Sequence, residues 1–232
     1  MIRIRKSADR GQADHGWLQT SHTFSFADYY DPSQMNFSVL RVINEDQIAP
    51  ESGFGTHGHK DMEIITYVVS GALSHKDSMG HATTILPGEV QRLSAGTGIK
   101  HSEFNESNQV NTHLLQIWFL PEISGIRPSY EQKSYKKAFL NNNFVLVASK
   151  SGEEGSVSIN QDLKMYVGKS ITSGHISFEP IGHRNIWIQV IHGTLELNGQ
   201  MATAGDGIAV TEINLLNLRW DAEIEFILFD LP

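Results

Sequence analysis

Short runs of β-branched and aromatic residues, separated by turn signals, are the feature that most limits how this chain can fold. His22, Phe24 and Phe26 alternate with polar Thr23 and Ser25, which is the period-two pattern of a strand with one buried face. No amphipathic pattern continues for more than about two helical turns. The sequence therefore predicts an all-β protein built from sandwiches or barrels. Similar apolar runs, with Gly, Pro, Asn and Asp between them, occupy residues 37–43, 63–69, 114–119, 144–148, 187–191 and 224–229.

A weak internal repeat indicates that the 232 residues form two similar halves. The segment VSGAL at residues 69–73 resembles IHGTL at residues 191–195, and a turn with Gly before an acid follows each, at Gly88 and Gly205. Between residues 121 and 137 the composition becomes polar, with Pro and Gly, as in a linker. We therefore predict an N-terminal domain over residues 1–128 and a C-terminal domain over residues 129–232.

The composition argues against several classes of protein. The chain has no cysteine, which excludes disulfides, thiolate-bound metals and cysteine nucleophiles. Lys and Arg number 18 against 26 Asp and Glu, and the net charge of -8 argues against binding to nucleic acid or to an anionic membrane. No segment approaches the roughly 18 apolar residues of a membrane span, and the first residues, MIRIRK, lack the apolar stretch of a signal peptide. We expect a cytoplasmic protein that binds neither nucleic acid nor membrane.

Two pairs of side chains predict a metal site. His57 and His59 lie two residues apart, as do His101 and Glu103, and a Gly-rich segment precedes each pair. On a strand this spacing places both side chains on one face, so two such pairs on neighbouring strands would bring four ligands to one cation. Imidazoles and a carboxylate, without sulfur, suit Fe(II), Mn, Ni, Cu or Zn better than Ca or Mg. The alternative is a solvated polar strand face, which one isolated pair would favour and two pairs do not.

Glu63 is a competing carboxylate, because His57-x-His59-x-x-x-Glu63 is also a known ligand spacing. Along a straight strand Glu63 would lie about 13 Å beyond His59, so it could join the site only if residues 60–62 formed a bulge or a turn. Glu103 needs no such device, because it lies two residues from His101 on the same face.

These residues resemble the motifs of the cupin superfamily and, more narrowly, of the pirin family. Residues 57–63 with Gly71 resemble the first cupin motif, and residues 98–105 resemble the end of the second. The segments GWL at 16–18, HTFSF at 22–26 and YYDP at 29–32 resemble the N-terminal signature of pirins. The resemblance implies a bicupin, two antiparallel β-barrels in tandem with a single metal in the N-terminal barrel. The family's ligands then fall on His57, His59, His101 and Glu103.

The chain departs from the cupin motifs at two positions, and its second half lacks the metal pairs. Glu51 stands where the first motif has Gly, and Gly96 stands where the second has Pro; neither is a ligand. No His-x-His pair occurs after residue 113. We therefore predict one metal per chain, in the N-terminal barrel. Transferring the ligand offsets from Gly71 and Gly88 to the second half gives Glu179, Ile181, Leu218 and Trp220.

The other histidines and the aromatic residues are expected to be structural. His15 and His22 should pack near an N-terminal hairpin, His75 and His81 should face solvent, and His113 could lie behind the ligands. We also expect four aromatic residues to belong to the core rather than to contact a substrate: Phe24, Phe26, Phe54 and Trp118. A flat aromatic substrate would, however, need aromatic walls of this kind.

The resemblance implies a metal-dependent oxygenase. Several pirin-like proteins resemble cupin quercetinases, the quercetin 2,3-dioxygenases of flavonoid metabolism, which open the flavonol ring with O2 and release carbon monoxide. We therefore expect a flavonol and O2 as substrates, and Glu103 as the general base that accepts the flavonol 3-hydroxyl proton. Fe2+ is the first expectation for the metal, with Zn, Mn, Ni, Cu or Co as alternatives.

Two other readings stay open from the sequence. Animal pirins resemble regulators, so the alternative is a metal-bearing regulatory protein that binds a protein partner in a metal- or redox-dependent way. A third reading is a degenerate barrel kept as a structural module, which the four intact ligands disfavour.

Overall fold

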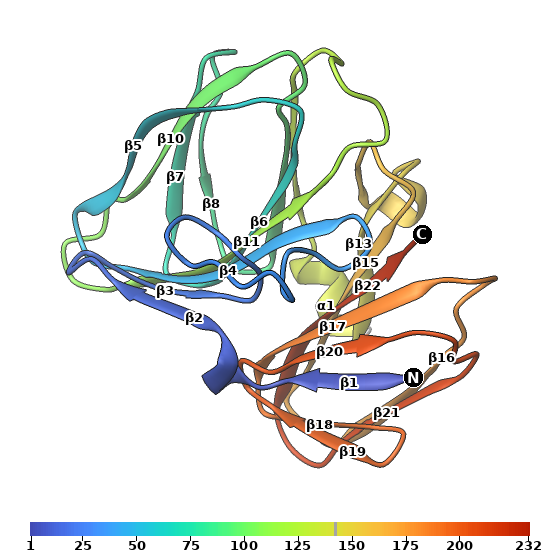
Figure 1. Cartoon of the computed structure of the whole chain (residues 1–232). Helices are drawn as coiled ribbons and strands as arrows, with labels where there is room; N and C mark the ends of the chain where they lie inside the picture. Colours follow the sequence, from blue (N-terminus) through green and yellow to red (C-terminus); the bar gives the residue numbers. More distant parts are fainter. Residues whose placement is uncertain (142) are drawn as a thin grey trace.

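The protein consists of four β-sheets in two domains that lie one above the other (Figure 1). The computed structural model describes residues 1–141 and 143–232. Each domain pairs a seven-stranded sheet with a four-stranded sheet, and the sheets are not closed into cylinders. Strand neighbours in the described residues are antiparallel, except for one short parallel pair near the C-terminal domain's sheet edge. The predicted all-β fold with two similar domains is confirmed.

The N-terminal domain carries the candidate ligands on its smaller sheet. The larger sheet has, in spatial order, β12 (Ser129–Ser134), β9 (Glu89–Ser94), β6 (Glu63–Ser70), β11 (Thr112–Phe119), β4 (Leu40–Ile48), β3 (Leu18–His22) and β2 (Gly11–Asp14). The smaller sheet has β5 (Ser52–His59), β10 (Ile99–Asn105), β7 (Leu73–Asp77) and β8 (Ala82–Ile85).

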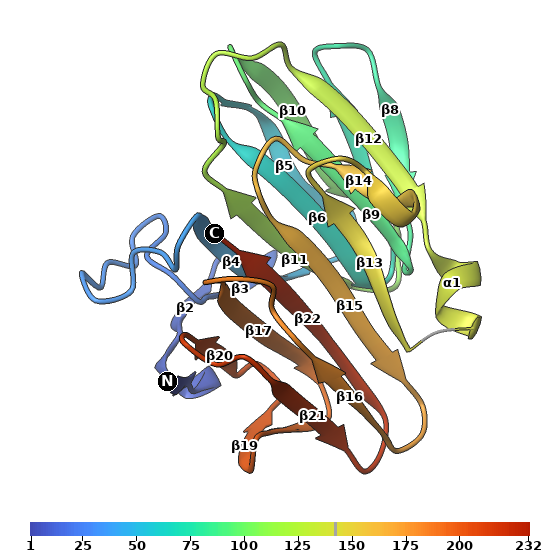
Figure 2. The ribbon, with the colours of Figure 1, turned by 90° about the vertical axis from the view of Figure 1, so that its right-hand side faces the viewer.

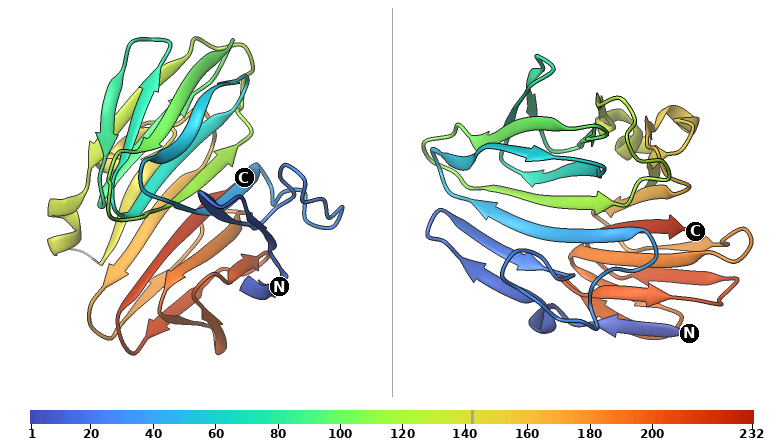
Figure 3. Two further views of the ribbon diagram at one scale, coloured as in Figure 1. Left: turned by 90° about the vertical axis from the view of Figure 1, so that its left-hand side faces the viewer. Right: turned by 45° about the horizontal axis from the view of Figure 1, so that its top comes forward.

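The C-terminal domain repeats this arrangement. Its larger sheet has β1 (Ile2–Arg5), β20 (Gly207–Val210), β17 (Asn185–His192), β22 (Ile224–Leu231), β15 (Lys164–Ser170), β13 (Phe144–Ser149) and β14 (Val157–Ser158). Its smaller sheet has β16 (Gly174–Phe178), β21 (Leu216–Trp220), β18 (Thr194–Leu197) and β19 (Gln200–Thr203). The helical segments are η1 (Ser7–Asp9), η2 (Glu153–Gly155) and α1 (Lys136–Asn141), which projects at one side of the molecule (Figure 3).

The two large sheets share one hydrophobic core. Ile65 and Ile117 of the N-terminal domain belong to the same buried cluster as Trp187 and Phe229 of the C-terminal domain. Strands such as β6 and β22 are therefore buried on both faces, which explains why they read as continuous apolar runs rather than as an alternation. The domains are therefore joined by a continuous buried apolar cluster.

Each domain completes its larger sheet with a strand from the other side of the predicted boundary. β1 pairs with β20 and lies among the C-terminal strands (Figure 1), while β12 pairs with β9 of the N-terminal domain (Figure 2). The expectation that residues 121–137 form a linker is wrong for β12, because its backbone forms a six-residue ladder with β9. The boundary between residues 128 and 129 stays a prediction. The exchange adds backbone hydrogen bonds to the apolar interface between the domains.

The weak repeat corresponds to the same turn in both domains. Gly71, between β6 and β7, has φ of 79°, and Gly193, between β17 and β18, has φ of 81°. A Cβ atom at Gly193 would lie 2.3 Å from the carbonyl oxygen of Glu223, and one at Gly71 would lie 2.7 Å from that of Asn111. Both positions thus need glycine for its backbone freedom and for the close approach of a neighbouring chain. Within the described residues, no helix has the length and apolar character needed to cross a membrane.

Candidate metal centre

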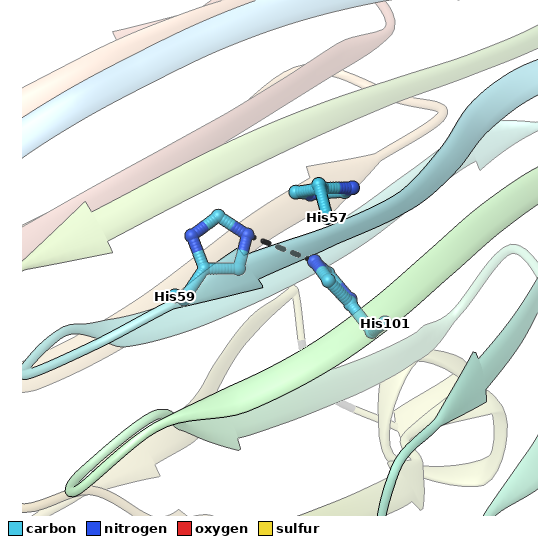
Figure 4. A group of neighbouring side chains, drawn as sticks. All are labelled: His57, His59 and His101. Carbon is cyan, nitrogen blue, oxygen red and sulfur yellow. Dashed lines mark hydrogen bonds between the residues drawn. The ribbon is translucent and has the colours of Figure 1, made fainter.

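Three imidazoles meet on the paired strands β5 and β10 (Figure 4). In the antiparallel register His101 lies directly opposite His57, and Ile99 lies opposite His59, so His59 is the diagonal neighbour of His101. The ring centroids of the three residues lie 4.4 to 4.8 Å apart. Nε2 of His59 lies 2.9 Å from Nε2 of His101. The strand parity that predicted convergence of these side chains is what brings them together.

Two of the three histidines, His59 and His101, have lowered pKa values. Burial, followed by the neighbouring His57, lowers the pKa of His59 to about 4. Burial and then the imidazoles of His57 and His59 lower the pKa of His101 to about 3. Both rings are therefore uncharged at neutral pH, and a ring nitrogen of each can offer a lone pair. The set of three nitrogens, with ligand atoms within 4.8 Å of one another, fits a first-row transition metal.

Glu103 lies beside the three histidines but faces a polar partner on the large sheet. Oε2 of Glu103 accepts a hydrogen bond of 2.6 Å from Nε2 of Gln116 on β11, and Oε1 lies 3.5 Å from the Thr66 hydroxyl. A bulge between His101 and Glu103 places Glu103 opposite Phe54 rather than Gly55. The carboxylate groups with His101 and buried His75, not with the cluster formed by His57, His59 and His101.

The environment of Glu103 favours its protonated form. Burial, and then the negative charge of Asp46, raise the pKa of Glu103 to about 7, although hydrogen bonds from Gln116 and Thr66 oppose the shift. A carboxyl group with such a pKa can take up and release a proton near neutral pH.

Glu63 binds elsewhere. The chain does turn after His59, with Asp61 at a φ of 48°, but Glu63 then begins β6 on the other sheet. Its Oε2 accepts hydrogen bonds of 2.9 Å from the Ser94 hydroxyl and 3.1 Å from the Asn160 backbone N–H. Since Asn160 belongs to the C-terminal domain, the carboxylate of Glu63 links the two domains instead of pointing to the histidines.

The expectation that His75 faces solvent is wrong. β7 pairs with β10 so that His75 lies opposite Glu103, and its side chain is fully buried, with its ring centroid 5.3 Å from that of His101. Its Nε2 lies 3.3 Å from Oδ2 of Asp77, which also bonds Nδ1 of His81 at 2.9 Å. His75 thus packs behind a candidate ligand and is fixed by Asp77. The sequence feature that could have indicated this is the spacing of His75 and Asp77, which lie two residues apart on one strand and therefore on the same face.

His113 does not lie behind the ligands. Its Nε2 lies 3.0 Å from Oε1 of Glu45, which is also paired with Arg10 at 2.8 Å. The three residues form a separate ionic cluster, so this part of the expectation is also wrong.

A cavity of about 440 Å³ opens onto the histidine cluster. Four aromatic side chains line it, and they contact one another and the histidines: Trp17 packs edge-on to Phe54 with centroids 5.1 Å apart, and Trp118 lies 5.3 Å from Phe26 and 4.9 Å from His59. Phe24 is core, as expected, but Phe26, Phe54 and Trp118 form walls instead. The sequence could not separate these roles, because an aromatic residue on a strand has the same pattern in either place.

The fold and the cluster together define a bicupin with a candidate metal centre in its N-terminal domain. Residues 3–119 match the family model described as Pirin, and residues 146–231 match that of the quercetinase C-terminal cupin domain. The chain therefore belongs to the pirin family, as the resemblance in its sequence indicated.

Several relatives are similar to this chain over nearly its whole length. It is 45% identical over 232 residues to quercetin 2,3-dioxygenase of Escherichia coli K12, covering 100% of this chain and 99% of that protein. It is 38% identical over 229 residues to a pirin-like protein of Caulobacter vibrioides, covering 97% of this chain and 98% of that one. The crystal structure of the bacterial pirin YhhW from Escherichia coli, in complex with nickel(II), matches with a TM-score of 0.95 and 45% identity over 100% of this chain and 99% of that one.

Proposed function

We propose that this protein is a metal-dependent dioxygenase that opens the heterocyclic ring of flavonols such as quercetin with O2 and releases carbon monoxide. The observation that carries the proposal is the aromatic-walled cavity, which is lined by His57 and His59 of the histidine cluster and by the buried carboxyl group of Glu103. The relatives named quercetin 2,3-dioxygenase and the nickel(II) complex of YhhW support it.

His57, His59 and His101 would hold the metal, with Glu103 as the fourth ligand. A divalent transition metal bound there supplies Lewis-acid and redox chemistry. Fe2+ is the first candidate, and nickel(II) becomes a strong second because the YhhW structure contains it. The other candidates are Zn, Mn, Cu and Co.

The cavity would bind and orient the flat substrate. Trp17, Phe26, Phe54 and Trp118 present aromatic faces and edges to its rings and exclude water from the reacting end. The 3-hydroxyl would then point toward the histidines and Glu103.

Glu103 would accept the proton of that 3-hydroxyl. Its pKa of about 7 matches a base that works near neutral pH, and the 2.6 Å hydrogen bond from Gln116 holds the carboxylate in place while the proton is transferred. Loss of this base should lower turnover more than it lowers substrate binding.

The test is flavonol consumption by anaerobically purified protein, loaded in turn with each metal and then given quercetin and O2. We expect Glu103→Gln to lower kcat by about 100-fold or more while substrate affinity changes little. Glu63→Gln is the matched control, since it also neutralises a buried carboxylate but one bound to Ser94 and Asn160; it should keep kcat within about threefold of the wild-type value.

Wild-type turnover in Glu103→Gln would contradict the role of Glu103, and loss of turnover in Glu63→Gln with an intact fold would favour the competing carboxylate. A metal-replete protein that consumes no flavonol with any ion would instead favour the regulatory alternative, in which the metal tunes binding to a protein partner.

A further inference from the structure

Asp46 is a buried carboxylate in the wall of the aromatic cavity. It lies on β4, opposite Thr20 of β3 and Leu114 of β11, and its side chain is 2% exposed. The cavity is lined by Asp46 and Thr20 as well as by Glu103 and the aromatic residues. Several other polar side chains of this wall have partners, since His22 and Asn44 bond each other at 2.7 Å and Gln116 bonds Glu103. A polar group in the wall that still lacks a partner defines a direction for a ligand.

One oxygen of the Asp46 carboxylate has no hydrogen-bond partner among the residues that the structure describes. Within the described residues Oδ1 of Asp46 forms no hydrogen bond, and the Thr20 hydroxyl beside it also has no partner of good geometry. Arg10, which lines the neighbouring groove beside β3 and β4, is paired with Glu45. Burial raises the pKa of Asp46 to about 6 against the opposing effect of Thr20. A buried acid without a cation or a set of donors is costly to keep.

The other buried acids of this domain differ from Asp46 in this respect. Glu63 receives hydrogen bonds from Ser94 and Asn160, and Glu103 receives one from Gln116. Those carboxylates have partners within the protein, so their burial contributes to the fold. Asp46 lines the cavity, so a molecule that binds there can supply the missing partner once a small side-chain movement exposes Oδ1, which is itself closed to solvent.

We propose that Asp46 accepts a hydrogen bond from a phenolic hydroxyl of the flavonol, away from the 3-hydroxyl that faces the histidines, and that Asp46 thereby selects polyhydroxylated flavonols. The inference rests on the function proposed above. A polyhydroxylated flavonol has apolar faces, which the aromatic walls cover, and polar edges, which need acceptors once water has left. A site built around such a hydrogen bond discriminates strongly against an analogue that lacks the hydroxyl, because the buried acceptor is then left unpaired.

The test compares the binding of two flavonols to nickel(II)-loaded protein without O2, followed by quenching of tryptophan fluorescence. Quercetin carries hydroxyls on both of its outer rings, whereas 3-hydroxyflavone keeps only the 3-hydroxyl. Asp46→Leu should weaken quercetin binding by about 10-fold or more and 3-hydroxyflavone binding by less than about threefold. Thr20→Val, which keeps the shape of Thr20, should give a smaller loss that is also confined to quercetin.

Gln47→Leu is the matched control, because Gln47 is the next residue on β4 and lines a polar groove outside the aromatic cavity. It should leave both affinities unchanged. A second readout is the thermal unfolding of the ligand-free protein, in which Asp46→Asn and Asp46→Leu should not lower Tm, since each removes an unpaired buried charge. If Asp46 instead stabilised the fold, both variants would have a lower Tm than the wild type.

Equal losses for the two flavonols, or no loss for either, would overturn the role of Asp46 while leaving the dioxygenase proposal intact. A fall in Tm for both Asp46 variants would overturn it as well. If the wild-type protein binds neither flavonol and consumes neither in air, the proposed function fails and the role of Asp46 fails with it.

Discussion

The two domains share one strand order and differ in what fills the space between their sheets. In the smaller sheets β5, β10, β7 and β8 correspond in order to β16, β21, β18 and β19. The larger sheets correspond in the same way, and even the exchanged strands β12 and β1 occupy equivalent edges, next to β9 and β20. The backbone frame is therefore not what makes one domain a candidate metal centre.

The difference lies in a few inward-facing positions. Where His57 lies opposite His101 in the N-terminal domain, the corresponding strands β16 and β21 place Ile176 opposite Leu218 and Phe178 opposite Leu216. Leu218 belongs to a continuous buried cluster with Leu195, Leu197 and other apolar residues, with Ile176 packed against it. The same frame thus makes a dry core when these positions are apolar, and a cavity that ends in imidazoles when they are not.

The glycine offsets located the corresponding strand for one of the two predicted pairs. Leu218 and Trp220 are buried apolar residues of β21, so neither offers a metal ligand. Glu179 and Ile181 are wrong, because they lie beyond β16 and Ile181 is 88% exposed. The register instead pairs Ile176 and Phe178 with Leu218 and Leu216. The segment between the end of this strand and the glycine turn is three residues longer in the second half, because Phe178 lies 15 residues before Gly193 whereas His59 lies 12 residues before Gly71.

The largest effect is expected when a ligand position of the N-terminal domain receives the residue type found in the C-terminal domain. His101→Leu installs the residue that β21 has at the equivalent position. Metal affinity should fall by about 100-fold or more, because one of three imidazoles is lost. The Tm of the metal-free protein should change little, because buried Nδ1 of His101 has no partner among the described residues and the contact that is lost is the one between its Nε2 and His59. Metal titration by calorimetry and thermal unfolding measure the two effects.

A substitution in the C-terminal domain provides the control. Leu218→Ala should lower the free energy of unfolding by about 2–5 kcal/mol, as expected for a large-to-small change in a packed core. Metal affinity should stay at the wild-type value. An intact metal site in His101→Leu, or a lost one in Leu218→Ala, would mean that the two domains do not divide these roles.

The shared glycine turns test whether the two domains obey the same backbone constraint. Gly193→Ala and Gly71→Ala should each lower the free energy of unfolding by about 1–3 kcal/mol, because the added Cβ meets a carbonyl oxygen at positive φ. Gly193 should show the larger loss, since its contact is closer. Gly199→Ala separates strain from contact, because Gly199 has φ of 83° but open space around it, and it should lose least. Urea unfolding gives the ranking, and a larger loss at Gly199 would refute it.

The smallest expected effect lies at the seam between the domains. Burial alone would raise the pKa of Glu131, but hydrogen bonds from Lys133 and from the backbone and side chain of Ser158 lower it to about 2. The folded-state pKa is thus below the ordinary value of 4.5, so this contribution is present above about pH 4.5 and is lost as the pH falls toward 2. Glu131→Gln should therefore be less stable than wild type at pH 7, by at most about 1 kcal/mol, and equally stable near pH 2. A difference that grows on acidification would contradict this assignment.

Local patterns predicted much of the fold and the centre of the site. Strand periodicity depends on neighbouring residues, so the all-β fold and the convergence of His57, His59 and His101 could be derived from spacing. The exchange of β1 and β12 could not, because it depends on pairing with strands far away in the chain. The partners of Glu103 and the burial of His75 were missed for the same reason: each is set by the register of a neighbouring strand. Asp46 belongs to no sequence motif, and its unpaired oxygen could be recognised only from the structure.

The most direct test of the account is X-ray absorption at the nickel edge on protein loaded with one equivalent of nickel(II), for the wild type, His101→Leu and His175→Ala. His175 lies on β16 and faces outward, so its loss should change nothing. We predict a wild-type spectrum with about three imidazoles around the metal, one fewer or no bound metal in His101→Leu, and an unchanged spectrum in His175→Ala. A wild-type spectrum without imidazole scattering, or one that His101→Leu leaves unaltered, would contradict the assignment of the metal centre to the N-terminal domain.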